Sequence, residues 1–207
     1  VPSRKEERDM RCDEILNIQA MGLKKRLAHI HCQNAVIGLS GGLDSTLALL
    51  VTARTYDNLG KNRSEILAIS MPCFGTTGRT KSNAQSLAEA LGVSFREIPI
   101  GKAVAQHFAD IGQSMEQLDI TFENGQARER TQVLMDVANQ LGGMVIGTGD
   151  LSELALGWAT YNGDHMSMYG INGSIPKTLM RHIVQHLSNH AEKPLQAVLA
   201  DILDTPV

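Results

Sequence analysis

The residues with the clearest chemical potential form one short segment, SGGLDS at residues 40–45. Its two glycines let a bound group approach the backbone closely, and the free amides at a helix start attract anions. Ser40 and Ser45 add hydroxyl donors. Asp44 places a carboxylate beside that anion. Two neighbouring negative charges repel each other unless a divalent cation lies between them. The segment therefore predicts a phosphate site that also holds a metal ion.

Two other interpretations of this segment compete with the first. Residues 38–42, GLSGG, match the G-x-S-x-G pattern of a hydrolase nucleophile elbow. An elbow normally follows several strands, whereas this one ends the first strand, and His165 is the one clear candidate for its histidine. The segment could also be a tight turn that only packs a helix on a strand. A Walker A loop is excluded because its lysine is missing.

The elements that must position these residues alternate along the chain. Short, continuously apolar strands are predicted at residues 35–39, 66–71, 93–98 and 144–148. Helices are predicted at residues 10–32, 44–56, 80–91, 102–116, 126–141 and 177–189, and the glycine-rich residues 157–174 are predicted to be a loop. This pattern indicates an α/β fold, a doubly wound parallel sheet with helices on both faces. The loops at 40–45, 71–79 and 148–164 should then converge at one edge.

The amino-acid composition and net charge limit the classes of protein to which this chain can belong. The 207 residues are 43% hydrophobic and 20% charged, which suits one soluble globular domain. The net charge of −3 offers no polybasic signature for nucleic acid or membranes, and no apolar run approaches the ~20 residues of a membrane span. The three cysteines, Cys12, Cys32 and Cys73, suggest free thiols in a reducing cytoplasm. A start at Val1 and an abrupt end at Val207 suggest a piece of a longer chain.

Four blocks of sequence carry a family resemblance. SGGLDS at 40–45 resembles the SGGxDS loop of the ATP pyrophosphatases, which cleave ATP between its α and β phosphates. NGQARER at 124–130 and GTGDLSE at 147–153 resemble the N-x-x-A-R-x-R and GT-x(4)-E blocks of NAD synthetases. GWATYNGD at 157–164 resembles the segment that grips the dinucleotide in the glutamine-dependent type. The resemblance to the NAD synthetase family covers residues 10–207.

This resemblance implies a Rossmann-like fold of the ATP-pyrophosphatase type and a reaction. ATP, with Mg²⁺, adenylates deamido-NAD, and ammonia then displaces AMP to give NAD. The ammonia would come from glutamine through a glutaminase domain in the same full-length chain. Residues 1–207 would form a single synthetase domain that lacks this glutaminase domain and a C-terminal part. The family also implies a cytoplasmic homo-oligomer whose self-contact involves the helix at 10–32.

The resemblance implies roles for individual residues. Asp44 and Glu153 would bind magnesium and, with Lys177, carry catalysis. The ATP site would comprise Ser40, Gly41, Gly42, Asp44, Ser45, Met71, Thr148, Lys177 and Thr205. The deamido-NAD site would comprise Asn124, Arg128, Glu153 and Trp158. The contacts that some ammonia-dependent members make with a lysine at Tyr161 and an aspartate near Met168 do not carry over.

Plainer interpretations stay open for several of these residues. Arg128 could be a solvated helix residue, Trp158 a core residue, and Glu153 a carboxylate that only favours the first turn of a helix. The chain could belong to another ATP pyrophosphatase, such as a GMP synthetase, or be a module that binds adenine nucleotides without catalysis. His182, His186 and His190 recur every four residues on one helix face, which suits either zinc or a solvated surface, and we favour the surface.

Overall fold

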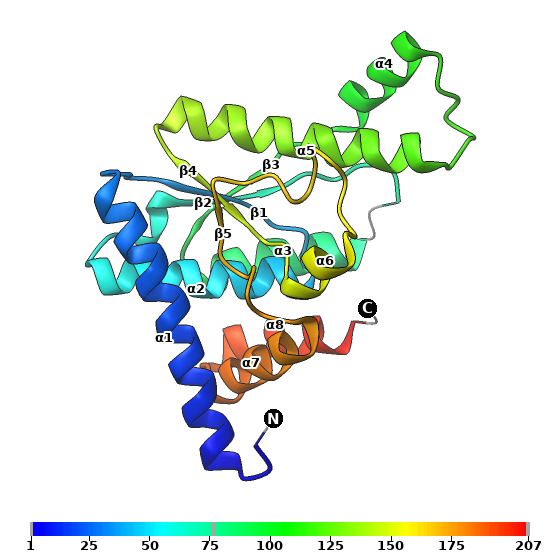
Figure 1. The fold of residues 1–207 in the computed structure, drawn as a ribbon. Helices are drawn as coiled ribbons and strands as arrows, with labels where there is room; N and C mark the ends of the chain where they lie inside the picture. Colours follow the sequence, from blue (N-terminus) through cyan, green and yellow to red (C-terminus); the bar gives the residue numbers. More distant parts are fainter. Residues whose placement is uncertain (1, 76–77, 206–207) are drawn as a thin grey trace.

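The computed structural model describes residues 2–75 and 78–205, and its centre is a parallel sheet of five strands (Figure 1). The strands lie in the order β3-β2-β1-β4-β5, and every pairing is parallel. Their bounds are Ala35–Gly38 for β1, Ile66–Ser70 for β2, Ser94–Glu97 for β3, Met144–Gly147 for β4 and Tyr169–Gly170 for β5. Thr76 and Thr77, which belong to the predicted loop at 71–79, lie outside the described residues.

Helices cover both faces of this sheet (Figure 1). α5 (Ile120–Leu141) and α4 (Gly101–Ile111) lie on one side, while α2 (Leu43–Leu59) and α3 (Gly78–Leu91) lie on the other. Beyond α2 and α3, α7 (Lys177–His190) and α8 (Lys193–Asp204) form a further layer. The long α1 (Lys5–His29) packs on α2 and α7, the short α6 (Leu151–Leu156) follows β4, and a 3-10 turn, Arg63–Glu65, precedes β2.

The strands are continuously apolar because both faces of the sheet are buried. In β1, Ile37 faces the main core shared with α1, α2 and α7, while its neighbour Val36 faces α5 and contacts the group that contains Val137 and Ala138. Both β1 side chains are completely buried. This alternation confirms the predicted fold class, a parallel α/β sheet wound on both sides.

The order of the strands determines where a ligand site can form. The chain runs outward from β1 to β2 and β3, then returns through α4 and α5 to β4 on the opposite side of β1. The connections that leave β1 and β4 therefore diverge, and they open a crevice beyond the carboxyl ends of these two strands. SGGLDS at 40–45 follows β1, and GTGDLSE at 147–153 spans the end of β4.

Several predicted boundaries were wrong for local reasons. α1 covers Lys5–His29 instead of 10–32. α5 begins at Ile120, six residues early, because the Asp119 side chain caps it by accepting hydrogen bonds from the backbone N–H groups of Thr121 and Phe122. α4 ends at Ile111, before the left-handed Gly112. The predictions missed α6 and α8, and they missed β5 inside the region predicted to be a loop.

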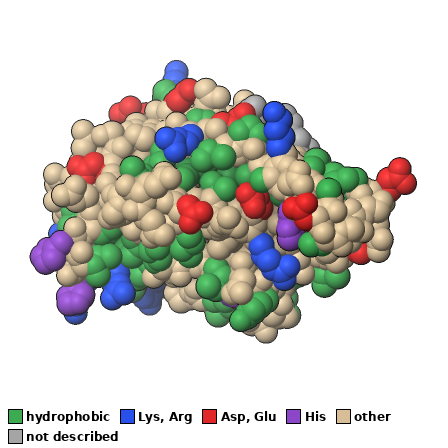
Figure 2. Space-filling view, turned by 90° about the horizontal axis from the view of Figure 1, so that it is seen from above, with side chains coloured by type: hydrophobic (Ala, Val, Ile, Leu, Met, Phe, Trp, Pro, Cys, Tyr) green, Lys and Arg blue, Asp and Glu red, His purple; other side chains and the backbone are tan. Residues whose placement is uncertain are grey.

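The surface carries charges of both signs. In the view onto the face that carries α5, acidic and basic side chains are interspersed, with apolar side chains visible between them (Figure 2). Within residues 2–75 and 78–205, no helix combines the length and the apolar character that a membrane crossing requires. Cys12, Cys32 and Cys73 form no disulfide in this part of the chain.

Candidate active site

The turn between β1 and α2 holds its shape through its own side chains. Gly41 adopts the left-handed region, at φ +83°, which a residue with a Cβ rarely does. The Ser40 hydroxyl accepts from the Gly42 amide at 3.2 Å and lies 3.1 Å from the Ser45 hydroxyl, which donates to the Gly42 carbonyl. Gly42 provides no side-chain cap for α2, so the helix start keeps its positive electrostatic character toward a ligand.

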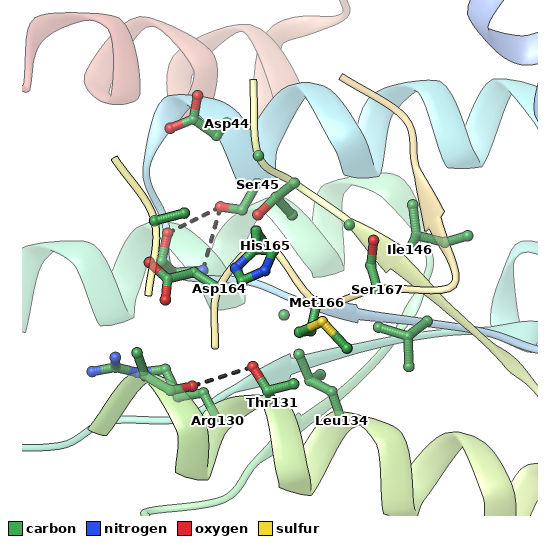
Figure 3. Close-up of a pocket in the computed structure, with 18 of the residues that line it drawn as sticks. Asp44, Ser45, Arg130, Thr131, Leu134, Ile146, Asp164, His165, Met166 and Ser167 are labelled. Atoms are coloured by element: carbon green, nitrogen blue, oxygen red, sulfur yellow. Dashed lines mark hydrogen bonds between the residues drawn. The ribbon is translucent and has the colours of Figure 1, made fainter. Parts of the chain in front are cut away.

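A cavity of about 560 Å³ opens beside this turn. Ser40, Gly42, Asp44 and Ser45 line one side of it. Figure 3 shows Asp44 and Ser45 at the start of α2, across the space from Arg130, Thr131 and Leu134 of α5. Five further residues from the predicted sites and sequence motifs also line the cavity, namely Met71, Thr148, Gly149, Glu153 and Trp158. The three loops that were predicted to converge therefore meet at this cavity.

Three carboxylates converge on one ammonium group at the edge of the cavity. Lys177, the first residue of α7, places its Nζ 2.6 Å from Asp44 Oδ1 and 3.0 Å from Asp150 Oδ2. Glu153 Oε1 lies 3.6 Å from the same nitrogen. The structure thus brings together Asp44, Glu153 and Lys177 from three distant segments. Three negative charges around one positive charge leave a net negative site that favours additional cations.

Asp150 is a member of this cluster that the sequence argument missed. Its side chain is completely buried, and its Oδ1 accepts from the Glu153 amide at 2.8 Å. The Glu153 carboxylate in turn accepts from the Asp150 amide at 3.2 Å, which completes a capping box at the start of α6. The two residues fix one another, so Asp150 orients the Glu153 carboxylate at the cavity.

The electrostatic state of Lys177 follows from its neighbours. Partial burial alone would lower its pKa, but the hydrogen bonds to Asp44 and Asp150 and the nearby charge of Glu153 outweigh burial and raise the pKa to about 12. Lys177 therefore stays protonated at neutral pH. It acts in this site as a fixed positive charge and not as a proton acceptor.

Asn172 joins the two loops that carry the predicted ligand-binding residues. Its side chain is completely buried. Its Nδ2 group donates to the backbone carbonyl of Asp44 at 3.0 Å and to that of Thr148 at 3.1 Å. Gln19 of α1 supports the arrangement by donating to the Ile171 carbonyl at 2.9 Å. A single amide group therefore sets the spacing between the end of β1 and the end of β4.

Asn172→Asp is expected to lower the free energy of unfolding by about 2–4 kcal/mol, because a carboxylate cannot donate to two buried carbonyls. Urea unfolding measures the change. Asn58→Asp is the control, since Asn58 is exposed on α2, and its effect should stay below about 0.5 kcal/mol. Equal losses in both variants would contradict the bridging role of Asn172.

Two residues of the predicted substrate site, Asn124 and Arg128, form hydrogen bonds that hold the loop after α6 against α5. Arg128 Nε donates to the Tyr161 carbonyl at 3.1 Å, and the Thr160 hydroxyl donates to Asn124 Oδ1 at 2.7 Å. Neither Asn124 nor Arg128 is among the residues that line the cavity. Trp158, which precedes the fastened part of the loop, lines the cavity and is 79% exposed. The core interpretation of Trp158 was therefore wrong.

Helical geometry separates the two arginines of the NGQARER block. Arg130 lines the cavity, whereas Arg128, two residues earlier, lies on another side of α5 and reaches the Tyr161 loop. Residues two apart on a helix do not share a face, so the spacing could have shown that only one arginine faces the crevice. Other lining residues that the predictions did not select are Thr131, Leu134, Asp164, His165, Met166 and Ser167.

Thr205 and the hydrolase interpretation fit the site less well. Thr205 donates through its hydroxyl to the Asp201 carbonyl at the end of α8 and is not among the described cavity-lining residues. The Ser40 hydroxyl is engaged with Gly42 and Ser45 inside the turn. No described hydrogen bond joins it to a histidine, so the cavity lacks the serine–histidine arrangement of a nucleophile elbow.

Chemically, the cavity combines two complementary features. A helix start with free donors, suited to an anion, adjoins a carboxylate cluster suited to cations. A broad apolar and aromatic wall lies beside both, formed by α5 and by the segment around Trp158. Such a site can hold a charged, phosphate-bearing ligand together with a flat organic group.

Comparison with known proteins gives clear sequence matches. A family model described as "NAD synthase" matches residues 15–198. The glutamine-dependent NAD(+) synthetase of Mycobacterium leprae (strain TN) is 47% identical over the whole of this chain. The match covers 32% of the length of that protein. The chain thus spans about one third of the curated relatives that it matches.

Solved structures agree with these matches. A glutamine-dependent NAD+ synthetase from Acinetobacter baumannii, solved with adenosine diphosphate, superposes with a TM-score of 0.84 and 25% identity. That similarity covers 92% of this chain and 35% of the other. An NH3-dependent NAD synthetase from Campylobacter jejuni subsp. jejuni gives a TM-score of 0.76 and 26% identity, covering 86% and 74% of the two chains.

Proposed function

The chain belongs to the NAD synthase family, and from this premise we propose that it is the ATP-dependent amide-forming part of a longer enzyme that converts deamido-NAD to NAD. The observation that carries the proposal is the joining of an anion site to a carboxylate cluster in one cavity. The Ser40–Ser45 turn supplies the first, and Asp44, Asp150 and Glu153 around Lys177 supply the second.

The proposed chemistry needs no nucleophile from the protein. A carboxylate oxygen of deamido-NAD attacks the α-phosphorus of ATP, and the bond from that phosphorus to the oxygen of pyrophosphate breaks. Ammonia then attacks the carbonyl carbon of the adenylate, loses a proton, and displaces AMP. The turn at 40–45 holds pyrophosphate with its backbone amides, while Lys177 offsets the negative charge that develops on the leaving oxygens.

The donor set at the edge of the cavity fits Mg²⁺. Carboxylate oxygens are its preferred protein ligands, and one or two of them suffice when phosphates and water complete the shell. Asp44 and Glu153 would hold the ion, since their side chains are 29% and 37% exposed, whereas Asp150 is closed off from solvent. When bound, the ion would neutralise phosphate charge. The role of Asp150 is to keep the Glu153 carboxylate directed at this position.

The other walls of the cavity suit the dinucleotide. Trp158 offers an exposed aromatic face for the pyridine ring. Asn124 and Arg128 hold the loop next to Trp158, and their own contact with the substrate stays a prediction, as does a contact between Thr205 and ATP. Arg130 lines the cavity and is a further cation within reach of a phosphate. We assign the adenine nucleotide to the region beyond the ends of β1 and β2, because Met71 lines the cavity there.

The nitrogen source belongs to the rest of the longer enzyme. Because this chain is similar to a glutamine-dependent NAD(+) synthetase and spans 32% of its length, we assign ammonia release to a glutaminase domain in the same full-length chain. Ammonia would then reach the adenylate at the cavity described here. Activity of the whole protein should therefore depend on glutamine or on added ammonia.

The ligand preference of the full-length protein tests this function. In isothermal titration calorimetry with ATP and Mg²⁺ present, deamido-NAD is expected to bind at least about tenfold more tightly than xanthosine monophosphate, because a site shaped for one substrate leaves buried polar groups unpaired with the other. Exchange of labelled pyrophosphate into ATP should require deamido-NAD. Preference for the purine nucleotide would indicate a GMP synthetase, and ATP binding without exchange would indicate a non-catalytic module.

A further inference from the structure

A second group of titratable side chains lies away from the cavity, where α1 packs on α7. Asp9 and Asp13 of α1 face His186 of α7, and His190 follows one turn later on the same helix. The His186 and His190 rings have their centroids 4.5 Å apart. His186 is only 7% exposed, so the prediction of a solvated histidine face was wrong for this residue.

The hydrogen bond of His190 defines which of its ring nitrogens is free. His190 Nδ1 lies 2.8 Å from the backbone carbonyl of His186. A carbonyl oxygen can only accept, so Nδ1 carries the hydrogen of the neutral ring. Nε2 is left with its lone pair. A carbonyl that fixes the tautomer in this way is the usual support for a histidine that binds a metal.

His186 sits between two carboxylates, whose negative charges favour a cation beside them. Its Nδ1 lies 3.0 Å from Asp9 Oδ1, and its Nε2 lies 3.4 Å from Asp13 Oδ1. A neutral imidazole has one N–H, so it would direct a lone pair at one of the two carboxylates. A cation bound between the ring and a carboxylate removes this repulsion.

We propose that Asp9, His186 and His190 form a binding site for a transition-metal ion, with Zn²⁺ as the ion that suits it best. Ligand atoms of these three residues lie within 4.8 Å of one another. Two histidine nitrogens and one carboxylate oxygen are a common ligand set for zinc, and histidines four residues apart on a helix present their rings to the same side. Water completes the coordination shell.

The geometry needs only a small adjustment to accept the ion. Zinc ligands lie about 2.0–2.2 Å from the ion, so ligand atoms in a tetrahedral shell are separated by about 3.3 Å. Asp9 and His190 are the two partners nearer the surface, so small side-chain rotations that keep the His190 Nδ1 hydrogen bond can bring the ligand atoms closer. Asp9 Oδ1 and His186 Nδ1 already lie 3.0 Å apart, close to that separation.

Neighbouring residues define the limits of the site. His182, the third histidine of the stripe, is not among the ligand atoms that cluster. Cys12 is not in the cluster either, and its thiol lies 4.0 Å from the His182 carbonyl. Lys5 and Arg8 line the same cavity as Asp9 and His186, and their positive charges oppose the binding of a cation there. The site is thus distinct from the carboxylate cluster around Lys177.

Zinc titration of the full-length protein, purified without a histidine tag and stripped with a chelator, tests the proposal. Competition with a chromophoric chelator should reveal one Zn²⁺ per chain whose binding weakens at least about tenfold in His190→Ala and in Asp9→Asn. Both residues are at least partly exposed, so these variants should fold. His107→Ala on α4 and His182→Ala on α7 are the matched controls, and they should bind as the parent does.

Substitution with Co²⁺ supplies a second measurement, since its visible absorption bands report nitrogen and oxygen ligands directly. Loss of those bands in His190→Ala, with retention in His182→Ala, would support the assigned ligands. Equal zinc binding by the parent, His190→Ala and Asp9→Asn would overturn the proposal. So would a loss confined to His182→Ala, which would place any metal on the histidine stripe without Asp9.

Discussion

Asp44→Asn and Glu153→Gln are each expected to slow AMP formation at least about 100-fold in the full-length protein, with the fold retained. Both changes keep the shape of the side chain and remove its charge. The charge acts on groups whose own charge grows during adenylation, and losing one such interaction typically costs 10²–10³ in rate. Rapid-quench measurement of AMP, with deamido-NAD and ATP saturating, isolates this step from amide formation.

Stability should change little in the same two variants. The ion pairs of Asp44 and Glu153 with Lys177 are partly open to solvent, and pairs of this kind contribute about 0–1 kcal/mol. Glu65→Gln is the matched control, because it removes a carboxylate that pairs with Lys61 outside the cavity. If both site variants formed AMP at the parent rate, the proposed roles of Asp44 and Glu153 would be wrong.

Lys177→Met should have the second largest effect, on both activity and stability. It leaves three carboxylates without their shared cation, and one of them, Asp150, is completely buried. We expect AMP formation to fall at least about tenfold. The free energy of unfolding should fall by about 1–3 kcal/mol, less than for a fully buried pair because the Lys177 side chain is 30% exposed.

Magnesium distinguishes this explanation from a loss of packing. A divalent ion can replace the missing ammonium, so Mg²⁺ should raise the melting temperature of Lys177→Met more than that of the parent. Lys25→Met, an exposed change on α1, should show no such difference. An equal response to Mg²⁺ in the parent and in Lys177→Met would show that the ion does not compensate for the lysine.

The pH range over which Lys177 contributes follows from its shifted pKa. A group whose pKa rises on folding, here from 10.5 to about 12, stabilises the folded protein fully below the lower value. That contribution is lost as the pH rises through the higher value. The stability difference between the parent and Lys177→Met should therefore stay constant from about pH 6 to pH 9.

The features of the fold that depend on local sequence patterns could be predicted from the sequence. The continuous apolar runs at residues 35–39 and 144–148 predicted buried parallel strands, and the structure has strands at 35–38 and 144–147. Once the strands were parallel, their carboxyl ends had to share one edge. The meeting of the Ser40–Ser45 turn with Glu153 at one cavity follows from that topology.

The supporting residues could not be predicted because their roles arise from contacts between distant segments. Asn172 lies in a stretch that reads as a loop, yet it bridges carbonyls 128 and 24 residues away. Asp150 reads as an ordinary helix cap, and its contact with Lys177 depends on how α7 returns to the sheet. The pairing of His186 with Asp9 joins residues 177 positions apart.

The two outer strands of the sheet bear on how copies of this chain can associate. β5 is only two residues long, and β3 ends in the exposed charged residues Arg96 and Glu97. Very short or charged outer strands are poor templates for the addition of another strand. Growth of the sheet from one molecule into the next is therefore disfavoured, which protects against edge-to-edge aggregation. Contacts between copies would instead involve helical surfaces, such as the side of α1 that exposes Ile18 and Met21.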